Sequence, residues 1–135
     1  MKKLVVDAGP LISFFYAKDP QHNECVAGVN QLQQGKTAII VPIPIVFEVY
    51  KWLLQRVNPS TAQSTLDVML ESFNLVPIGQ LELEELQTLV RTFPNWGGSL
   101  EDGTVIITAR RYRSPVWTIN YRDLAAFKDI EFWNR

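Results

Sequence analysis

Short, continuous runs of apolar residues recur along the chain, and longer stretches with a helical spacing of apolar positions separate them. A continuous run, unlike strict alternation of apolar and polar residues, is typical of a strand that is covered on both faces, as in a parallel sheet. The runs predict four strands and a weaker fifth strand at the sheet edge: residues 3–6, 38–42, 74–78, 116–119 and, for the edge strand, 130–133.

The stretches between these runs have the length and pattern of helices. Pro10 suits the first turn of the first helix, because the missing N–H of proline would have no partner there. Gly35 is expected to cap the C-terminus of the second helix, and Asn58 or Ser60 the N-terminus of the fourth. The fourth helix would place four apolar residues on one face: Leu66, Met69, Leu70 and Phe73. The second helix is predicted over residues 22–34, and the helices not yet mentioned over residues 44–57, 82–93 and 102–112.

Strands that alternate with helices indicate an α/β domain with a central parallel sheet of four to five strands. A length of 135 residues favours a single domain over residues 1–135. No apolar stretch is long enough to span a bilayer, and no signal-peptide pattern opens the chain, so we expect a cytoplasmic protein without a membrane segment.

Composition narrows the chemistry further. Cys25 is the only cysteine, which excludes an internal disulfide and a cysteine-based zinc site. The only histidine, His22, lies at a predicted helix start, and we interpret it as a surface or capping residue. The net charge of −1 means that overall charge would not attract nucleic acid, so any such binding would need metal ions or a local basic patch.

Three carboxylates stand at junctions where a parallel sheet usually forms its ligand site. Asp7 ends the first strand, Glu48 lies one turn into the helix after the second strand, and Asp102 opens the last long helix, after the loop NWGGS. In open α/β sheets, ligands bind outside the carboxyl ends of the strands. The sequence TINYRD, which follows the last clear strand, adds Asn120 and Asp123 at the same edge.

Helix capping is the simplest explanation for two of these acids when each is considered alone. Asp102 could cap its helix, or form a capping box with Ser99, and Asp7 could cap the helix at Pro10. Glu48 is different, because its neighbours are bulky and apolar, and a lone buried carboxylate costs several kcal/mol unless it is paired.

Considered together, the three acids predict a metal site. Carboxylates that converge at one sheet edge repel each other, and a divalent cation relieves that repulsion. Oxygen ligands of this kind select Mg²⁺ or Mn²⁺, and such a site suits the transfer of phosphoryl groups without a protein nucleophile. The expected ligands are Asp7, Glu48 and Asp102.

With these residues in place, the sequence resembles the PIN-domain ribonucleases, and specifically the VapC-type toxins of bacterial toxin–antitoxin pairs. The resemblance covers essentially the whole chain. Asp7 in VVDAGPLI, Glu48 in VFEVY and Asp102 in LEDGTVIITA match the first three family motifs. Thr118 and Asn120, with Asp123 downstream, match the fourth.

The resemblance implies a PIN-like three-layer α/β/α sandwich and a metal-dependent endoribonuclease that cleaves RNA phosphodiester bonds. It implies catalytic roles for Asn120 and Asp123 besides the three metal ligands, a site shaped by Thr118, a homodimer, and an antitoxin partner. Asn120 stands where many members of the family have an acid, and this departure favours an alternative, a catalytically weak module that binds RNA or protein. A haloacid-dehalogenase-like phosphatase is a poor rival, because Gly9 stands where that chemistry needs a second aspartate.

Two further features have alternative interpretations. Trp96 in the NWGGS loop could stack on an RNA base or pack beneath its own loop. Arg110, Arg111 and Arg113 could contact RNA phosphates, or they could simply complement the negative end of the helix dipole.

Overall fold

The structure, a computed structural model, describes residues 2–133 and forms the expected α/β fold around a parallel sheet. The sheet has four strands in the order β3-β2-β1-β4: β1 (Lys3–Val6), β2 (Ala38–Pro42), β3 (Asn74–Val76) and β4 (Val116–Trp117). Seven helices in the described residues accompany it: α1 (Ala8–Phe15), α2 (His22–Gln34), α3 (Ile43–Arg56), α4 (Pro59–Ser72), α5 (Gln80–Thr92), α6 (Leu100–Tyr112) and α7 (Tyr121–Leu124).

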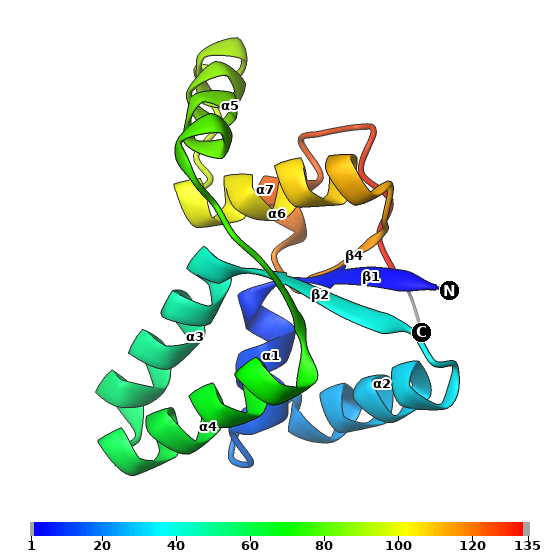
Figure 1. Cartoon of the computed structure of the whole chain (residues 1–135), viewed down its shortest axis with the longest axis vertical. Helices are drawn as coiled ribbons and strands as arrows, with labels where there is room; N and C mark the ends of the chain where they lie inside the picture. The colour runs from blue at the N-terminus through cyan, green and yellow to red at the C-terminus, as the bar shows by residue number, and fades with distance from the viewer. Residues whose placement is uncertain (1, 134–135) are drawn as a thin grey trace.

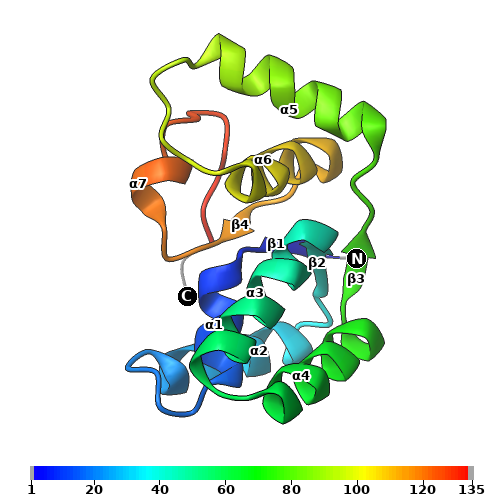
Figure 2. The same ribbon diagram turned by 90° about the vertical axis from the view of Figure 1, so that its left-hand side faces the viewer.

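The helices form layers on the two faces of the sheet. Helices α1 to α4 lie on one side of the strands, and α6 and α7 lie on the other, with α5 outermost (Figures 1 and 2). The predicted three-layer α/β/α arrangement is therefore present. The apolar residues of β1 and β4 are buried, and so are those of β2 except the half-buried Ala38, as expected for a sheet with helices on both faces.

The strand order creates a switch point beside β1. From β1 the chain proceeds outward through β2 to β3, and it then crosses to the opposite side of β1 to form β4. The crevice at such a reversal, outside the carboxyl ends of the strands, is where open α/β sheets bind their ligands. Here the strand order reverses between β1 and β4.

Helix α6 is the central helix of its layer, because it packs between the sheet and α5. Its residues from Gly103 to Ala109 are all buried. Gly103 makes the close approach of α5 possible, since a Cβ atom there would lie 2.7 Å from the Cδ2 atom of Leu86. A helix buried on all sides reads as apolar all round, and this explains why its sequence shows little amphipathic pattern.

Several predicted boundaries differ from the structure at the strand ends. β3 ends at Val76 and β4 at Trp117, so both strands are shorter than the apolar runs that predicted them. The fifth strand is reduced to one parallel bridge between Val116 and Phe132, supported by hydrogen bonds on either side of Val116. In the described part of the chain the sheet therefore has four strands and an isolated bridge at the β4 edge.

The helix predictions need corrections at three starts and at one face. Asp7 caps α1 directly, so this helix begins at Ala8 and not at Pro10. Helices α5 and α6 begin at Gln80 and Leu100, two residues before their predicted starts. Leu70 is 60% exposed, so it does not share the buried face of Met69. Gly35 is the C-cap of α2, as predicted, with φ −79°, and the next residue, Lys36, has a positive φ of 53°. Asn58, and not Ser60, caps α4 by accepting a hydrogen bond from the Thr61 N–H at 2.7 Å.

Candidate active site

Asp7 lies at the switch point and is only 4% exposed. Its backbone N–H donates to the carbonyl of Trp117 at 2.9 Å, which continues the pairing of β1 with β4 beyond the last strand residue. Its carboxylate accepts a hydrogen bond from the Ala8 N–H at 2.8 Å and so caps α1. Burial raises the pKa of Asp7, the hydrogen bonds from Thr118 and Ala8 oppose that rise, and repulsion from Asp102 adds to it.

A chain of hydrogen bonds connects Asp7 to the segment after β4. The hydroxyl of Thr118 donates to Oδ2 of Asp7 at 2.8 Å, and the backbone N–H of Asn120 donates to that same hydroxyl oxygen at 2.8 Å. The side-chain amide of Asn120 donates to Oδ2 of Asp123 at 3.2 Å. The predicted residues Thr118, Asn120 and Asp123 therefore form one connected group beside Asp7.

Glu48 lies on α3 and is partly buried, as its apolar neighbours suggested. Burial, followed by repulsion from Asp7, Asp102 and Glu101, raises the pKa of Glu48 to about 7. All of these influences disfavour the ionised form, and none comes from a cation. Glu48 is therefore a carboxylate whose surroundings, within the described residues, provide no positive charge to match it.

Asp102 shows both features that its sequence context predicts. It is the third residue of α6, where its Oδ2 accepts a hydrogen bond from the Ser99 N–H at 3.0 Å. In return, the Ser99 hydroxyl accepts from the Asp102 N–H at 3.1 Å, which completes a capping box. The charge of Asp102 also repels the other acids, and this repulsion raises the pKa of both Asp7 and Glu48.

The residues present fit a hard cation in chemistry but are not assembled around one. Four carboxylates, including the unpredicted Glu101, are close enough for their charges to interact, and their oxygens are the donors that Mg²⁺ and Mn²⁺ prefer. Nevertheless, between residues 2 and 133 no group of three or more His, Cys, Asp and Glu side chains is arranged to hold a metal ion. The carboxylates of Asp7 and Asp102 are instead engaged in hydrogen bonds with their own surroundings.

Trp96 packs beneath its loop, which is one of its two predicted interpretations. Its indole N–H donates to the carbonyl of Asp123 at 2.8 Å, and its ring lies edge-on to Phe127 at 5.0 Å between centroids. The backbone of Gly98 lies against the ring, because a Cβ atom there would approach the ring within 2.2 Å. Trp96 thus ties the loop before α6 to α7, and its ring is engaged within the protein.

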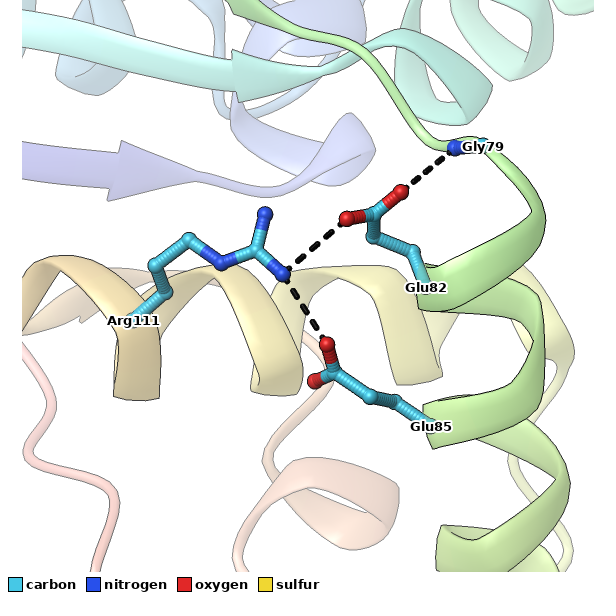
Figure 3. Close-up of polar contacts among 4 residues, drawn as sticks. All are labelled: Gly79, Glu82, Glu85 and Arg111. Atoms are coloured by element: carbon cyan, nitrogen blue, oxygen red, sulfur yellow. Dashed lines mark hydrogen bonds and ion pairs between the residues drawn. The ribbon is translucent and has the colours of Figure 1, made fainter.

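The arginines at the end of α6 also have partners within the chain. Arg110 forms a two-pronged ion pair with Asp129 at 2.8 and 3.0 Å. Arg111 contacts Glu82 at 3.1 Å and Glu85 at 2.9 Å, and so joins α6 to α5 (Figure 3). These residues follow Asp102 by eight and nine positions, or about 12–14 Å along a helix. The structure therefore favours their structural interpretation over contact with RNA.

Sequence reasoning missed two residues of this region. Glu101 directly precedes Asp102, and in the sequence it was considered only as part of the motif around Asp102. The charge of Glu101 nevertheless raises the pKa of Glu48. Arg122 lies between Tyr121 and Asp123, and its side chain is 90% exposed, with Nε 3.7 Å from Oδ1 of Asp123. The sequence signal for Arg122 was its position inside TINYRD, the segment that also supplies Asn120 and Asp123.

Comparison with solved structures identifies the fold. VapC20 of Mycobacterium tuberculosis, described as a sarcin-ricin loop cleaving toxin, superposes with a TM-score of 0.78 at 14% identity, over 91% of this chain and 94% of that one. VapBC2 of Rickettsia felis, bound to a DNA fragment of its promoter, gives 0.73 at 12% identity over 98% of both chains. FitAcB of Neisseria gonorrhoeae gives 0.67 at 18% identity, over 97% of this chain and 96% of that one.

The chain has the PIN-domain fold of the VapC type. The expected fold is thereby confirmed, and the likeness extends over nearly the whole chain. No family model and no curated protein sequence matches it. Among the described residues, no helix has the length and apolar character needed to cross a membrane.

Proposed function

We propose that this PIN domain is a metal-dependent endoribonuclease and that its active site is the group of acids around Asp7. The observation that carries the proposal is the state of Glu48. Burial and three neighbouring acids raise the pKa of Glu48 to about 7, at the edge of the sheet where this fold class binds ligands. A structural role would not require uncompensated negative charge there, whereas binding of a cation would.

The side chains divide into two roles in this proposal. Asp7, Glu48 and Asp102 would hold Mg²⁺ or Mn²⁺, with Glu101 close enough to contribute charge. When bound, the cation supplies the positive charge that stabilises a phosphodiester during hydrolysis. Thr118 orients Asp7, and Asn120 holds Asp123 beside it, so that these residues maintain the arrangement of oxygens facing the substrate.

RNA as the substrate and an antitoxin as the partner are supported by the proteins that share the fold. VapC20 is described as cleaving the sarcin-ricin loop, and a further match is a toxin–antitoxin complex from Klebsiella pneumoniae. The chain also exposes apolar side chains on α3 and α5, including Phe47 and Leu81, which are 70% and 73% exposed. Such surface suits a protein partner, and we propose a homodimer with an antitoxin that covers the acidic site.

One alternative has a specific observation in its favour. The carboxylate of Asp102 is engaged in a capping box, and the acids do not form a ready metal site in the described chain. A catalytically weak module that binds RNA or protein would have these features.

The test compares acid variants at and away from the site. Asp7→Asn and Glu48→Gln should abolish Mn²⁺-dependent cleavage of single-stranded RNA. The melting temperature of Glu48→Gln without metal should stay the same or rise, because repulsion is relieved. Asp67→Asn, which changes an exposed acid of α4, is the matched control and should cleave normally. Mg²⁺ or Mn²⁺ should raise the melting temperature of the wild type. No cleavage and no cation binding at millimolar concentration would favour the weak module.

A further inference from the structure

A groove lies between the loop that follows α5 and helix α7. Its volume is about 470 Å³, which is within the usual range for ligand pockets. The loop side of its lining includes Phe93, Trp96 and Gly97, and α7 contributes Arg122 and Asp123. Figure 2 shows this loop passing beside α7 on its way to α6. We call this feature the loop groove.

The loop groove adjoins the candidate active site through Asp123. This residue lines the groove, and its Oδ2 accepts a hydrogen bond from the side-chain amide of Asn120 at 3.2 Å. The backbone N–H of Asn120 in turn donates to the Thr118 hydroxyl, which donates to Asp7, with each distance 2.8 Å. A member of the connected group beside Asp7 therefore forms part of the groove, so a ligand in the groove would lie next to the acidic site.

The loop side of the groove offers an aromatic ring that is fixed from behind. Phe93 is 38% exposed, and its ring lies edge-on to the buried ring of Phe127, with centroids 4.7 Å apart and planes at 67°. Trp96 packs against the same Phe127 ring, and its indole N–H is bound to the carbonyl of Asp123. Phe93 can therefore stack against a flat ligand at little cost in conformational entropy.

The α7 side of the groove offers a positive charge. The side chain of Arg122 is 90% exposed, and its Nε lies 3.7 Å from Oδ1 of Asp123. An exposed ion pair at this distance contributes little free energy, so the guanidinium can turn to a phosphate and donate two N–H groups to it. A ring on one side and an arginine on the other suit a ligand that combines a flat ring with an anion. A nucleotide has both.

We infer that the loop groove holds one nucleotide of the RNA strand, with its base on Phe93 and its phosphate on Arg122, beside the phosphate that faces the acids. This inference rests on the proposed nuclease function and adds to it a subsite for the substrate. Single-stranded RNA suits such a subsite, because its unpaired bases can leave the stack and pack on an aromatic side chain. Stacking and phosphate contacts tolerate every base, so the subsite positions the strand and does not select its sequence.

Two variants change the groove in opposite ways. Phe93→Ala removes the stacking ring, whereas Gly97→Leu adds a side chain to the lining. The fold can accommodate that side chain, because a Cβ atom at Gly97 would have nothing within 4 Å beyond its chain neighbours. Each variant should weaken binding of a single-stranded RNA oligonucleotide roughly fivefold to a hundredfold, the range expected for loss of one stacked base. Fluorescence anisotropy with Ca²⁺ in place of Mn²⁺ measures this affinity without turnover.

The matched control for these variants is Leu70→Ala. Leu70 is also an exposed apolar residue, but it lies on α4 and does not line the groove. Its removal should leave the affinity for RNA unchanged. Equal weakening in Leu70→Ala and Phe93→Ala would overturn the inference.

RNA oligonucleotides that lack one base at a time test the stacking contact directly. One abasic position should lower the affinity of the wild type as much as Phe93→Ala lowers it for intact RNA. On that abasic RNA, Phe93→Ala should have no further effect, because the same contact is already lost. Arg122→Ala should still weaken binding, because the phosphate remains. An equal effect of Phe93→Ala on intact RNA and on every abasic RNA would overturn the inference.

The outcomes separate the loop groove from the nuclease function. Cleavage by the wild type, together with unchanged RNA affinity in both groove variants, would overturn the groove and leave the nuclease proposal standing. RNA binding without cleavage by the wild type, weakened in both variants, would overturn the nuclease proposal and support the groove. No RNA binding by the folded wild type would overturn both. Circular dichroism identifies Phe93→Ala protein that fails to fold, and Gly97→Leu then decides the result.

Discussion

Thr118 donates its hydroxyl proton to the carboxylate of Asp7 across the gap between β4 and β1, although 111 positions separate the two residues in the chain. The direction of this bond is fixed, because the backbone N–H of Asn120 donates to the same hydroxyl oxygen and leaves the proton free to point at Asp7. One bond thus joins the two strand ends that define the switch point and orients the most buried acid of the site.

The first prediction concerns the contribution of this hydrogen bond to the stability of the fold. Thr118→Val keeps the shape of the side chain but leaves a buried carboxylate oxygen without its donor, so we expect a loss of about 1–3 kcal/mol in the free energy of unfolding. Thr108→Val is the matched control. The hydroxyl of Thr108 is buried and has no hydrogen-bond partner within the described residues, so its removal should be neutral or stabilising. Urea denaturation measures the free energy of unfolding of both variants. An equal loss in the two variants would contradict this account.

The fold was largely predictable from the sequence, and its errors lie where tertiary contacts decide. Continuous apolar runs located all four strands, because a strand that is covered on both faces consists mainly of apolar residues and is therefore visible in the sequence. The same runs overestimated β3 and β4: beyond Val76, Ile78 packs against the core outside the strand, and beyond Trp117, Ile119 is 44% exposed. The pattern records burial, whereas strand length depends on the partner.

The second prediction concerns the pH dependence of stability. Because the pKa of Glu48 is raised from 4.5 to about 7 in the folded protein, the folded state binds more protons than the unfolded state between these values. Stability contributed by this group is therefore present at low pH and is lost as the pH rises towards 7. Glu48→Gln should flatten that decline and stabilise the metal-free protein by about 1–2 kcal/mol at pH 8, after allowance for solvent screening. Melting curves of the metal-free wild type and of Glu48→Gln at pH 5 and pH 8 measure this stabilisation. An equal stabilisation at both pH values would contradict the raised pKa of Glu48.

The third prediction separates the two roles of Asp102. Ser99→Ala removes the hydroxyl that caps α6, so it should cost about 0.5–2 kcal/mol of stability while leaving the carboxylate of Asp102 and RNA cleavage intact. Asp102→Asn retains an oxygen for the Ser99 N–H but loses the charge, so it should abolish Mn²⁺-dependent cleavage with a smaller loss of stability. Denaturation and cleavage assays on the two variants should therefore give opposite rankings. Loss of cleavage in a folded Ser99→Ala protein would indicate that the cap itself is needed.

The candidate site was less fully predictable than the fold, for reasons visible in single residues. Asp7 and Glu48 could be singled out because a carboxylate in an apolar setting has a cost that the sequence alone reveals. The pairing of Asp102 with Ser99 was also anticipated, but its consequence for metal geometry was not, because a capping bond fixes a side-chain direction that spacing does not specify. Arg110 and Arg111 show a further limit, since their partners Asp129, Glu82 and Glu85 lie in other elements.

The last prediction concerns which arginine would contact RNA in the proposed function. Arg122 is exposed, has only a loose contact with Asp123, and follows the residues that connect to Asp7, whereas Arg110 is bound by both oxygens of Asp129. Arg122→Ala should weaken binding of single-stranded RNA regardless of its sequence and should reduce the slope of log affinity against log salt concentration by about 0.7, the value for one phosphate contact. Arg110→Ala, the matched control, should leave the slope unchanged and change stability by less than about 1 kcal/mol. A reduced slope in Arg110→Ala with no change in Arg122→Ala would instead place the RNA at the far end of α6, away from the acids. That outcome would also count against the active site proposed around Asp7.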